Sequence, residues 1–206
     1  MSYFAMLKGL ISDTVAVPVR VDSSTHSLQT ISYSHHEVHG GSSYHASFHN
    51  LTANTDDHRT AIGLVTSATT KWMHMTVSAS AAAAAELFIL EAPTINNDAG
   101  TQKAVYNRNR NSANTSLVTD VSASPTAGTV ETYVEAELAT LVGGTEIEQF
   151  NLVAGTGAKT IGGDARGTEE WILDQGVLYL FIVQNVGASA NLHEIHLNWY
   201  EHTDKS

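Results

Sequence analysis

The sequence contains no cysteine, so disulfide bonds and thiolate metal sites are excluded. It also has little charge, because only 15% of its 206 residues are Asp, Glu, Lys or Arg, where about 25% is usual. The polar surface must therefore come largely from Ser, Thr, Asn, Gly and His. Such a surface suits a rigid β protein and protein–protein contacts better than it suits a highly solvated enzyme.

Positive charge is especially scarce, with 10 basic against 21 acidic residues, a net charge of −11 and no Lys/Arg run. Binding to a phosphate backbone needs clustered positive charge, so nucleic acid is not expected as a partner. No apolar run approaches the roughly 20 residues of a membrane helix, so no membrane partner is expected. The opening MSYFAMLKGLIS has no basic leader or small-residue cleavage site, and no signal peptide is predicted.

The most regular apolar pattern lies near the C-terminus. Residues 177–186 are nearly all apolar and rich in β-branched and aromatic types, which predicts a strand buried on both faces. Residues 192–200 alternate, which predicts a half-buried strand. Its two faces are Ile195, Leu197 and Trp199 on one side, and Glu194, His196 and Asn198 on the other. The small residues 187–191 between these strands predict a hairpin at the centre of one sheet.

Further short strands are expected along the chain, with turns between them and no β-α alternation. They are predicted at 44–53, 60–66, 71–80, 87–90, 101–106, 115–121 and 145–153. The alanine run 79–85 favours helix by propensity, but we interpret it as a strand or bulged connection in a β context. Residues 130–142 fit either period, and we assign them to a strand. Some nine to eleven strands indicate an all-β protein, an antiparallel β-sandwich that is jelly-roll-like.

We assign this sandwich to residues 33–206 and an extended N-terminal arm with an edge strand to residues 1–32. Val17 and Val19 belong to an alternating segment in which Pro18 cannot donate to a ladder and so favours an edge position. The segment, with Arg20, fits an arm that pairs with a neighbouring subunit. The alternative is an edge strand of the same sheet.

Histidine is abundant, with eleven residues, so metal binding has to be considered. The HHxxH segment holds His35, His36 and His39. A zinc-protease helix needs two His four apart with Glu directly after the first, whereas Glu37 follows His36, which is three residues before His39. The flanking Ser and Gly do not favour a helix.

Two other histidine pairs lie in predicted strands. His193 and His196 should face opposite sides of their strand. His45 and His49 share a face but lie roughly 13 Å apart. No metal site is predicted, although a site assembled from distant strands stays open.

Acidic groups offer further candidates. Asp56-Asp57-His58 fits a metal-ligating loop or an acidic loop tip. Five glutamates fit the acid and base of a sugar cleft, or a solvated strand face: Glu131, Glu135, Glu137, Glu146 and Glu148. On a strand, Glu135 with Glu137 and Glu146 with Glu148 each share one face. No aromatic platform accompanies them, so we predict no catalytic residue and do not expect an enzyme.

The glycine-rich segment 155–167 resembles a phosphate loop only superficially. The P-loop spacing requires glycine where the chain has Val153 and Ala158. We predict a surface loop there and no cofactor site. Arg108 and Arg110 in NRNRNS are different, since two guanidinium groups amid asparagines suit pairing with carboxylates of a partner. The alternative is a solvated turn.

Five segments together resemble a family of tailed-bacteriophage virion proteins that are described as structural or head-decoration-like. They are HEVHGGSSYHA (36–46), TTKWMHMTVS (69–78), NRNRNS (107–112), the glycine-rich loop running into EEWIL (169–173), and NWYEHTDK (198–205). The resemblance covers roughly residues 33–205, and residues 1–32 show none.

The resemblance implies a virion protein on the outer capsid surface, a decoration protein that binds the major capsid protein and stabilises its lattice. It also implies a homo-oligomer, and a trimer fits three-fold sites. The partner-binding residues expected are Val17, Val19, Arg20, Arg108 and Arg110. Two alternatives are a tail, neck or fibre component and a glycan-binding module for host attachment. The second would need Trp72, Tyr44 or Tyr106 to cluster in a groove.

Overall fold

The structure is a computed structural model that describes residues 8–12, 15–18, 32–152, 159–161 and 170–203. The chain divides into two compact units, residues 1–36 and 37–206. In the first unit, β1 (Lys8–Ser12) pairs antiparallel with β2 (Val15–Pro18) in a two-stranded sheet of its own. The predicted strand at Val17 is thus confirmed as far as Pro18. Val19 and Arg20 lie outside the described residues.

The HHxxH segment is helical, which corrects the expectation of a non-helical turn. Helix α1 (Tyr33–Gly40) ends where Gly41 takes a φ of 73°. The amide of Ser42 donates to the carbonyl of Glu37, and the amide of Gly41 donates to that of Val38. This is a Schellman motif, in which glycine takes the left-handed conformation after the last helical turn. The Gly-Gly pair therefore ends a helix.

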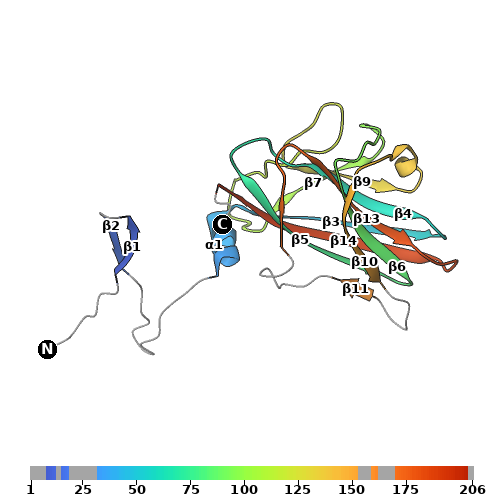
Figure 1. The fold of residues 1–206 in the computed structure, drawn as a ribbon, viewed down its shortest axis with the longest axis horizontal. Helices are drawn as coiled ribbons and strands as arrows, with labels where there is room; N and C mark the ends of the chain where they lie inside the picture. Colours follow the sequence, from blue (N-terminus) through green and yellow to red (C-terminus); the bar gives the residue numbers. More distant parts are fainter. Residues whose placement is uncertain (1–7, 13–14, 19–31, 153–158, 162–169, 204–206) are drawn as a thin grey trace. The chain divides into compact units, whose positions relative to one another are not determined.

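The second unit is an antiparallel sandwich of two sheets, as predicted (Figure 1). One sheet has the order β10 (Thr145–Leu152), β6 (Ala85–Glu91), β13 (Leu178–Asn185), β4 (Arg59–Val65), β9 (Thr129–Val134) and β7 (Thr101–Ala104). The other has the order β11 (Lys159–Ile161), β5 (Trp72–Ala81), β14 (Asn191–His202), β3 (Ser43–Asn54) and β8 (Tyr106–Asn107). β12 (Trp171–Leu173) also pairs with β5.

The strand pairing is that of a jelly roll. Eight strands form nested pairs in sequence order, in which the first pairs with the last, the second with the next to last, and so on. The pairs are β3 with β14, β4 with β13, β5 with β11, and β6 with β10. β14 also pairs with β5, and β13 also pairs with β6, which joins the nested pairs into the two sheets. Such nested antiparallel pairing gives two Greek keys folded over one core. The segment from β7 to the 3-10 helix η1 (Glu137–Thr140) lies between β6 and β10 in sequence.

The predicted hairpin at the C-terminus is wrong, although both of its strands are confirmed. β13 is buried over Tyr179–Val183, and β14 alternates with Ile195, Leu197 and Trp199 buried. The two strands lie in different sheets and do not pair with each other. The turn at 187–191 therefore carries the chain from one layer of the sandwich to the other.

Three other local assignments are settled by the structure. The alanine run 79–85 is strand and connection, as predicted, since Ala79–Ala81 end β5, Ala85 begins β6 and residues 82–84 connect them. Residues 115–121 form isolated bridges at Thr119 in place of the expected strand. The strand expected over 130–142 ends at Val134, because the chain turns into η1 there and the Glu137 carboxylate accepts the Val134 amide at 2.8 Å.

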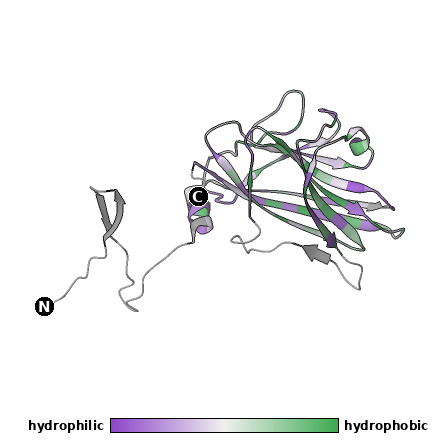
Figure 2. Cartoon of the chain, viewed as in Figure 1, coloured by the Kyte–Doolittle hydropathy of each residue, from purple (hydrophilic) through white to green (hydrophobic). Residues whose placement is uncertain are grey.

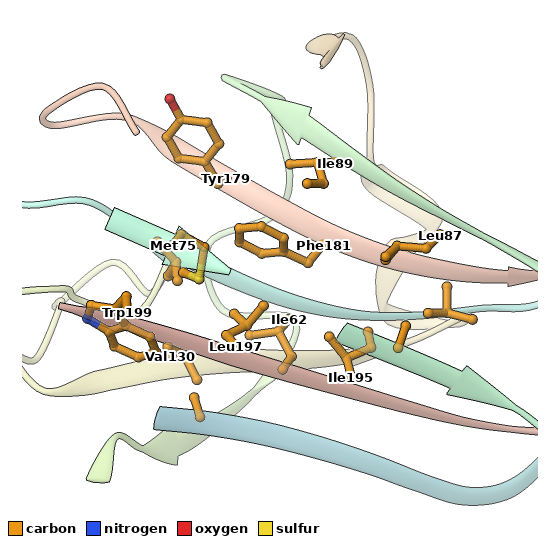
Figure 3. Close-up of a cluster of buried hydrophobic side chains, with 14 of the residues drawn as sticks. Ile62, Met75, Leu87, Ile89, Val130, Tyr179, Phe181, Ile195, Leu197 and Trp199 are labelled. Atoms are coloured by element: carbon orange, nitrogen blue, oxygen red, sulfur yellow. The ribbon is translucent and has the colours of Figure 1, made fainter. Parts of the chain in front are cut away.

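The main core fills the space between the sheets. Figure 3 shows Phe181 and Ile62 of one sheet opposite Leu197 and Ile195 of the other, and Trp199 lies in the same cluster. Along several strands, hydrophobic residues alternate with hydrophilic ones (Figure 2). Each large side chain buried in this way contributes about 1.5–3 kcal/mol. This layer holds the two sheets face to face and fixes which strand faces point outwards.

A second apolar cluster covers the opposite face of β13 and β4. It contains Leu180, Ile182, Tyr133 and Leu138, the last from η1. β13 is consequently buried on both faces, as its unbroken apolar sequence predicts.

Gly63 lies in β4 under this second cluster, and we expect Gly63→Ala to destabilise the protein by about 2 kcal/mol. A Cβ there would meet Leu180 Cδ2 at 2.7 Å and Tyr133 Cε2 at 2.9 Å, both in a filled core. The measurement is urea denaturation. Gly187→Ala is the matched control, because a Cβ at Gly187 meets nothing within 4 Å. Equal stabilities of the two variants would contradict this account of the packing.

Candidate functional site

The NRNRNS loop that follows β8 is built by its asparagines. Asn107 is buried, and its side-chain amide donates to the carbonyls of Gly41 at 2.8 Å and Asn114 at 3.0 Å. Its carbonyl oxygen accepts the Asn109 amide at 2.9 Å, and that of Asn109 accepts the Asn111 amide at 3.1 Å. Each asparagine thus satisfies local backbone groups, which is the usual use of Asn in turns.

The arginines alternate with these asparagines and are exposed. The backbone amide of Arg108 donates to the carbonyl of Ser43 at 2.9 Å, which ties the loop to the start of β3. The Arg110 guanidinium lies over the Tyr106 ring, 5.5 Å from its centroid. Within the described part of the chain, neither guanidinium has an acidic partner. The loop therefore exposes both arginines, and their pairing with carboxylates of a partner stays a prediction.

A hollow of about 340 Å³ lies beside this loop on the outer face of the second sheet. It is lined by His45, Tyr106, Asn107, Arg108, Arg110 and Asn198. Register explains the grouping, because His45 pairs with Tyr106 on one side and with Asn198 on the other. Tyr106 is one of the most exposed large side chains, at 55%. The hollow therefore joins two cations, an aromatic ring, an amide and an imidazole.

Histidines continue from the hollow along the same outer face. The rings of His45 and His196 stack with centroids 5.8 Å apart, and Glu194 lies 2.8 Å from His196 Nε2. Burial lowers the pKa of His45, and His196 and Arg108 nearby lower it further, against opposing hydrogen bonds to Asn198 and the Leu197 backbone. The hydrogen bond with His196 lowers the pKa of Glu194. His45 therefore enters the hollow as a neutral group near pH 7.

A second histidine cluster lies at the C-terminal end of β14. His74 stacks on Tyr200 with ring centroids 4.7 Å apart and lies 4.5 Å from His202. The Tyr200 hydroxyl donates to Glu170 at 2.9 Å. Among the residues that the structure describes, no group of three or more His, Asp or Glu side chains is placed to hold a metal ion.

The remaining candidate histidines lie in different environments. His193 and His196 face opposite sides of β14, as predicted: His193 is fully buried and His196 is half-buried. Burial lowers the pKa of His193 to about 4. His35, His36 and His39 are exposed side chains of α1.

The acidic candidates have structural partners or lie apart. Glu135 pairs with Arg59 through two side-chain hydrogen bonds of 2.7 and 2.8 Å, and Glu137 accepts a backbone amide. A bulge separates Glu146 from Glu148, so the pair does not share one regular strand face. Asp56 and Asp57 form an exposed turn. No two of these carboxylates are brought together across the hollow.

Three predictions fall wholly or partly outside the described residues. Of segment 155–167, for which a surface loop is predicted, only Lys159–Ile161 is described, and these residues form strand β11, which corrects the prediction there. Val19 and Arg20 are not covered, and Val17 is placed in β2 by its backbone.

Sequence reasoning missed the hollow itself. Tyr106 was singled out for glycan binding and the arginines for carboxylate pairing, but their union with His45 and Asn198 depends on strand register. Tyr44, by contrast, is 3% exposed and belongs to the core. Its hydroxyl donates to the Gly41 and Thr115 carbonyls, and burial with the nearby Glu201 charge raises its pKa to about 12.

Comparison with known proteins returned no matching family model, no matching curated protein and no matching solved structure. In the described part of the chain, no helix is long and apolar enough to cross a membrane.

Proposed function

We propose that this chain is a non-enzymatic structural protein of a tailed-bacteriophage virion, a decoration protein on the outer surface of the capsid. The observation that carries the proposal is the jelly-roll body, an architecture used by many viral capsid domains, in a chain whose motifs resemble virion proteins. The low charge content and the structural use of Glu135 and Glu137 also support it.

The partner in this proposal is the major capsid protein, and the mechanism is mechanical. A protein that binds the assembled lattice but not separated subunits stabilises the lattice by mass action. The proposed contacts are the N-terminal arm, with Val17, Val19 and Arg20, and the loop that presents Arg108 and Arg110. Self-association as a homo-oligomer, with a trimer favoured at three-fold points, would repeat these contacts around each axis.

We expect deletion of residues 1–30 to abolish attachment of the purified protein to capsids that lack it, because β1 and β2 form a two-stranded sheet whose outer edges pair with no other described strand. The double variant Arg108→Ala/Arg110→Ala should weaken attachment about tenfold or more through loss of charge-assisted bonds. Co-sedimentation measures both effects.

The double variant Lys71→Ala/Lys103→Ala is the charge-matched control and should bind like the unmodified chain. Attachment that survives the deletion would remove the arm from the proposal, and attachment unchanged in the arginine variant would remove the loop. Cryo-electron microscopy of the native particle tests the assignment itself. Density confined to the tail, neck or fibres would replace the decoration role by one of those alternatives.

A second candidate, glycan binding, is favoured by one observation. Of the three aromatics considered for a sugar platform, Tyr106 is exposed in a hollow beside polar side chains. Glycan binding is compatible with either position in the particle.

A further inference from the structure

The hollow beside NRNRNS is electrostatically unusual for this chain. The protein carries a net charge of −11, yet Arg108 and Arg110 bring two positive charges to one side of this hollow. Both lack an acidic partner among the residues that the structure describes. Guanidinium groups present paired donors that match the two oxygens of a carboxylate. The arginines therefore favour an anionic group with two oxygens, such as a carboxylate.

The other wall of the hollow offers different chemistry. Tyr106 presents a ring that is 55% exposed, and Asn198 and His45 add an amide and an imidazole from neighbouring strands. An amide and a neutral imidazole each combine donor and acceptor atoms, which suits hydroxyl groups. An exposed aromatic face suits a ligand with an apolar face of its own.

The hollow is also of a suitable size and is well supported. Its volume of about 340 Å³ falls within the about 300–1,000 Å³ of small-ligand sites, which carry a few placed polar groups. Asn107 and Asn109 hold the loop through backbone hydrogen bonds, and the floor is a paired strand. The backbone that carries the lining is thus positioned before a ligand arrives, which lowers the entropic cost of binding.

We propose that this hollow binds an acidic sugar, a pyranose ring that bears a carboxylate, such as a hexuronic acid residue of a glycan. Arg108 and Arg110 bind the carboxylate, Tyr106 packs against the apolar face of the ring, and Asn198 and His45 bind ring hydroxyls. An Asp or Glu side chain of a protein partner, as in the capsid contact proposed above, would engage the same two arginines, so the two ligands would compete for this loop. Only the sugar would also contact Tyr106 and Asn198. The assignment does not depend on where in a particle the chain lies.

The test is titration of the full chain with four probes, followed by NMR or calorimetry. The probes are galacturonic acid, neutral galactose, acetate and an acetylated Glu-Glu peptide. We expect galacturonic acid to bind at least tenfold more tightly than each of the other three, because only it combines the carboxylate with the ring.

Variants locate the binding on the molecule. Tyr106→Ala, Asn198→Ala and Arg108→Ala should each weaken galacturonic acid binding about tenfold or more, whereas Tyr106→Phe should retain it. Lys103→Ala is the charge-matched control. Thermal denaturation checks that each variant is folded. If Tyr106→Ala is unfolded, the Tyr106→Phe, Asn198→Ala and Arg108→Ala variants still test the site.

Each alternative outcome overturns the proposal in a recognisable way. Acetate binding equal to galacturonic acid would reduce the site to a carboxylate site without sugar selectivity. If the Glu-Glu peptide bound more tightly than galacturonic acid, and Tyr106→Ala did not change its affinity, the hollow would be assigned to a protein partner, as in the capsid contact proposed above. If none of the four probes bound, the hollow would not be a ligand site. The capsid proposal would be unaffected, because co-sedimentation tests it separately.

Discussion

Replacement of Glu201 by alanine should lower the free energy of unfolding by about 4 kcal/mol, the largest effect that we expect from a single carboxylate. Glu201 is 4% exposed at the end of β14. Its carboxylate accepts the Ser116 hydroxyl, the Leu117 amide at 3.0 Å and the Trp199 indole N–H at 3.1 Å. Alanine would leave three donors without an acceptor at a buried site. Chemical denaturation measures the loss.

Glu194→Ala is the matched control, because it removes a glutamate from the same strand. Glu194 binds His196 and Ser80 but is half-exposed, so water replaces those partners. Its removal should cost less than about 1 kcal/mol. If Glu201→Ala unfolded at the same denaturant concentration as Glu194→Ala, the three hydrogen bonds to Glu201 would not be a source of stability.

Asp120→Asn should cost about 3 kcal/mol at neutral pH. Asp120 is fully buried and accepts five hydrogen bonds. The donors are the Ser122 amide and hydroxyl, the Gln102 side-chain amide, the Thr126 amide and the Thr129 hydroxyl. Asparagine would place an NH2 group among donors and leave some of them unsatisfied.

The cost of Asp120→Asn should also depend on pH. Burial alone would raise the pKa of Asp120, but the hydrogen bonds from Ser122, Thr129 and Gln102 outweigh it and hold the pKa well below its ordinary value. A depressed pKa stabilises the fold above the unfolded-state pKa of about 3.9, and that stability is lost as pH falls from there towards the folded pKa. The difference between variant and unmodified protein should therefore shrink by about 1 kcal/mol from pH 7 to pH 3.

Urea denaturation at pH 7, 5 and 3 measures this pH dependence. Asp98→Asn is the control, since Asp98 is exposed and accepts one backbone amide, from Ala123. A difference between Asp120→Asn and unmodified protein that stayed constant down to pH 3 would refute the depressed pKa.

Burial periodicity made the two C-terminal strands predictable, but not their partners. The unbroken apolar run of β13 predicts burial on both faces, and the alternation of β14 predicts burial on one face. Both predictions are confirmed. The turn between them has a different origin. Asn185 donates to the carbonyls of Gly187 and Ser189, and Asn191 donates to Asn185. These side chains shape a crossing between layers, and no alternation pattern distinguishes such a crossing from a hairpin.

The helix and the bulged acidic strand were missed for local reasons. A Gly-Gly pair is typical both of a turn and of the end of a helix. The hydrogen bond from the Ser42 amide to the Glu37 carbonyl identifies the end of a helix here. Glu146 and Glu148 have the spacing of a shared strand face, but the bulge at Ile147 shifts their register.

Part of the candidate site could be predicted from the sequence. NRNRNS indicated two presented guanidinium groups, and Tyr106 was one of three candidate aromatics. Their neighbours His45 and Asn198 come from β3 and β14, which lie far apart in sequence, so only the pairing register brings them together. Successive residues of a strand point to opposite faces, so Tyr44, next to His45, points into the core.

The position of β14 has a consequence for how the protein is made. It is the last strand that the structure describes, and it lies between β3 and β5, so it supplies the hydrogen-bonding edge that both need. Loop closure between β3 and β14 spans most of the chain, and contacts of such long range slow folding. The sandwich cannot close on the ribosome before residues 191–202 have emerged, so a nascent chain exposes unpaired edges until synthesis is nearly over.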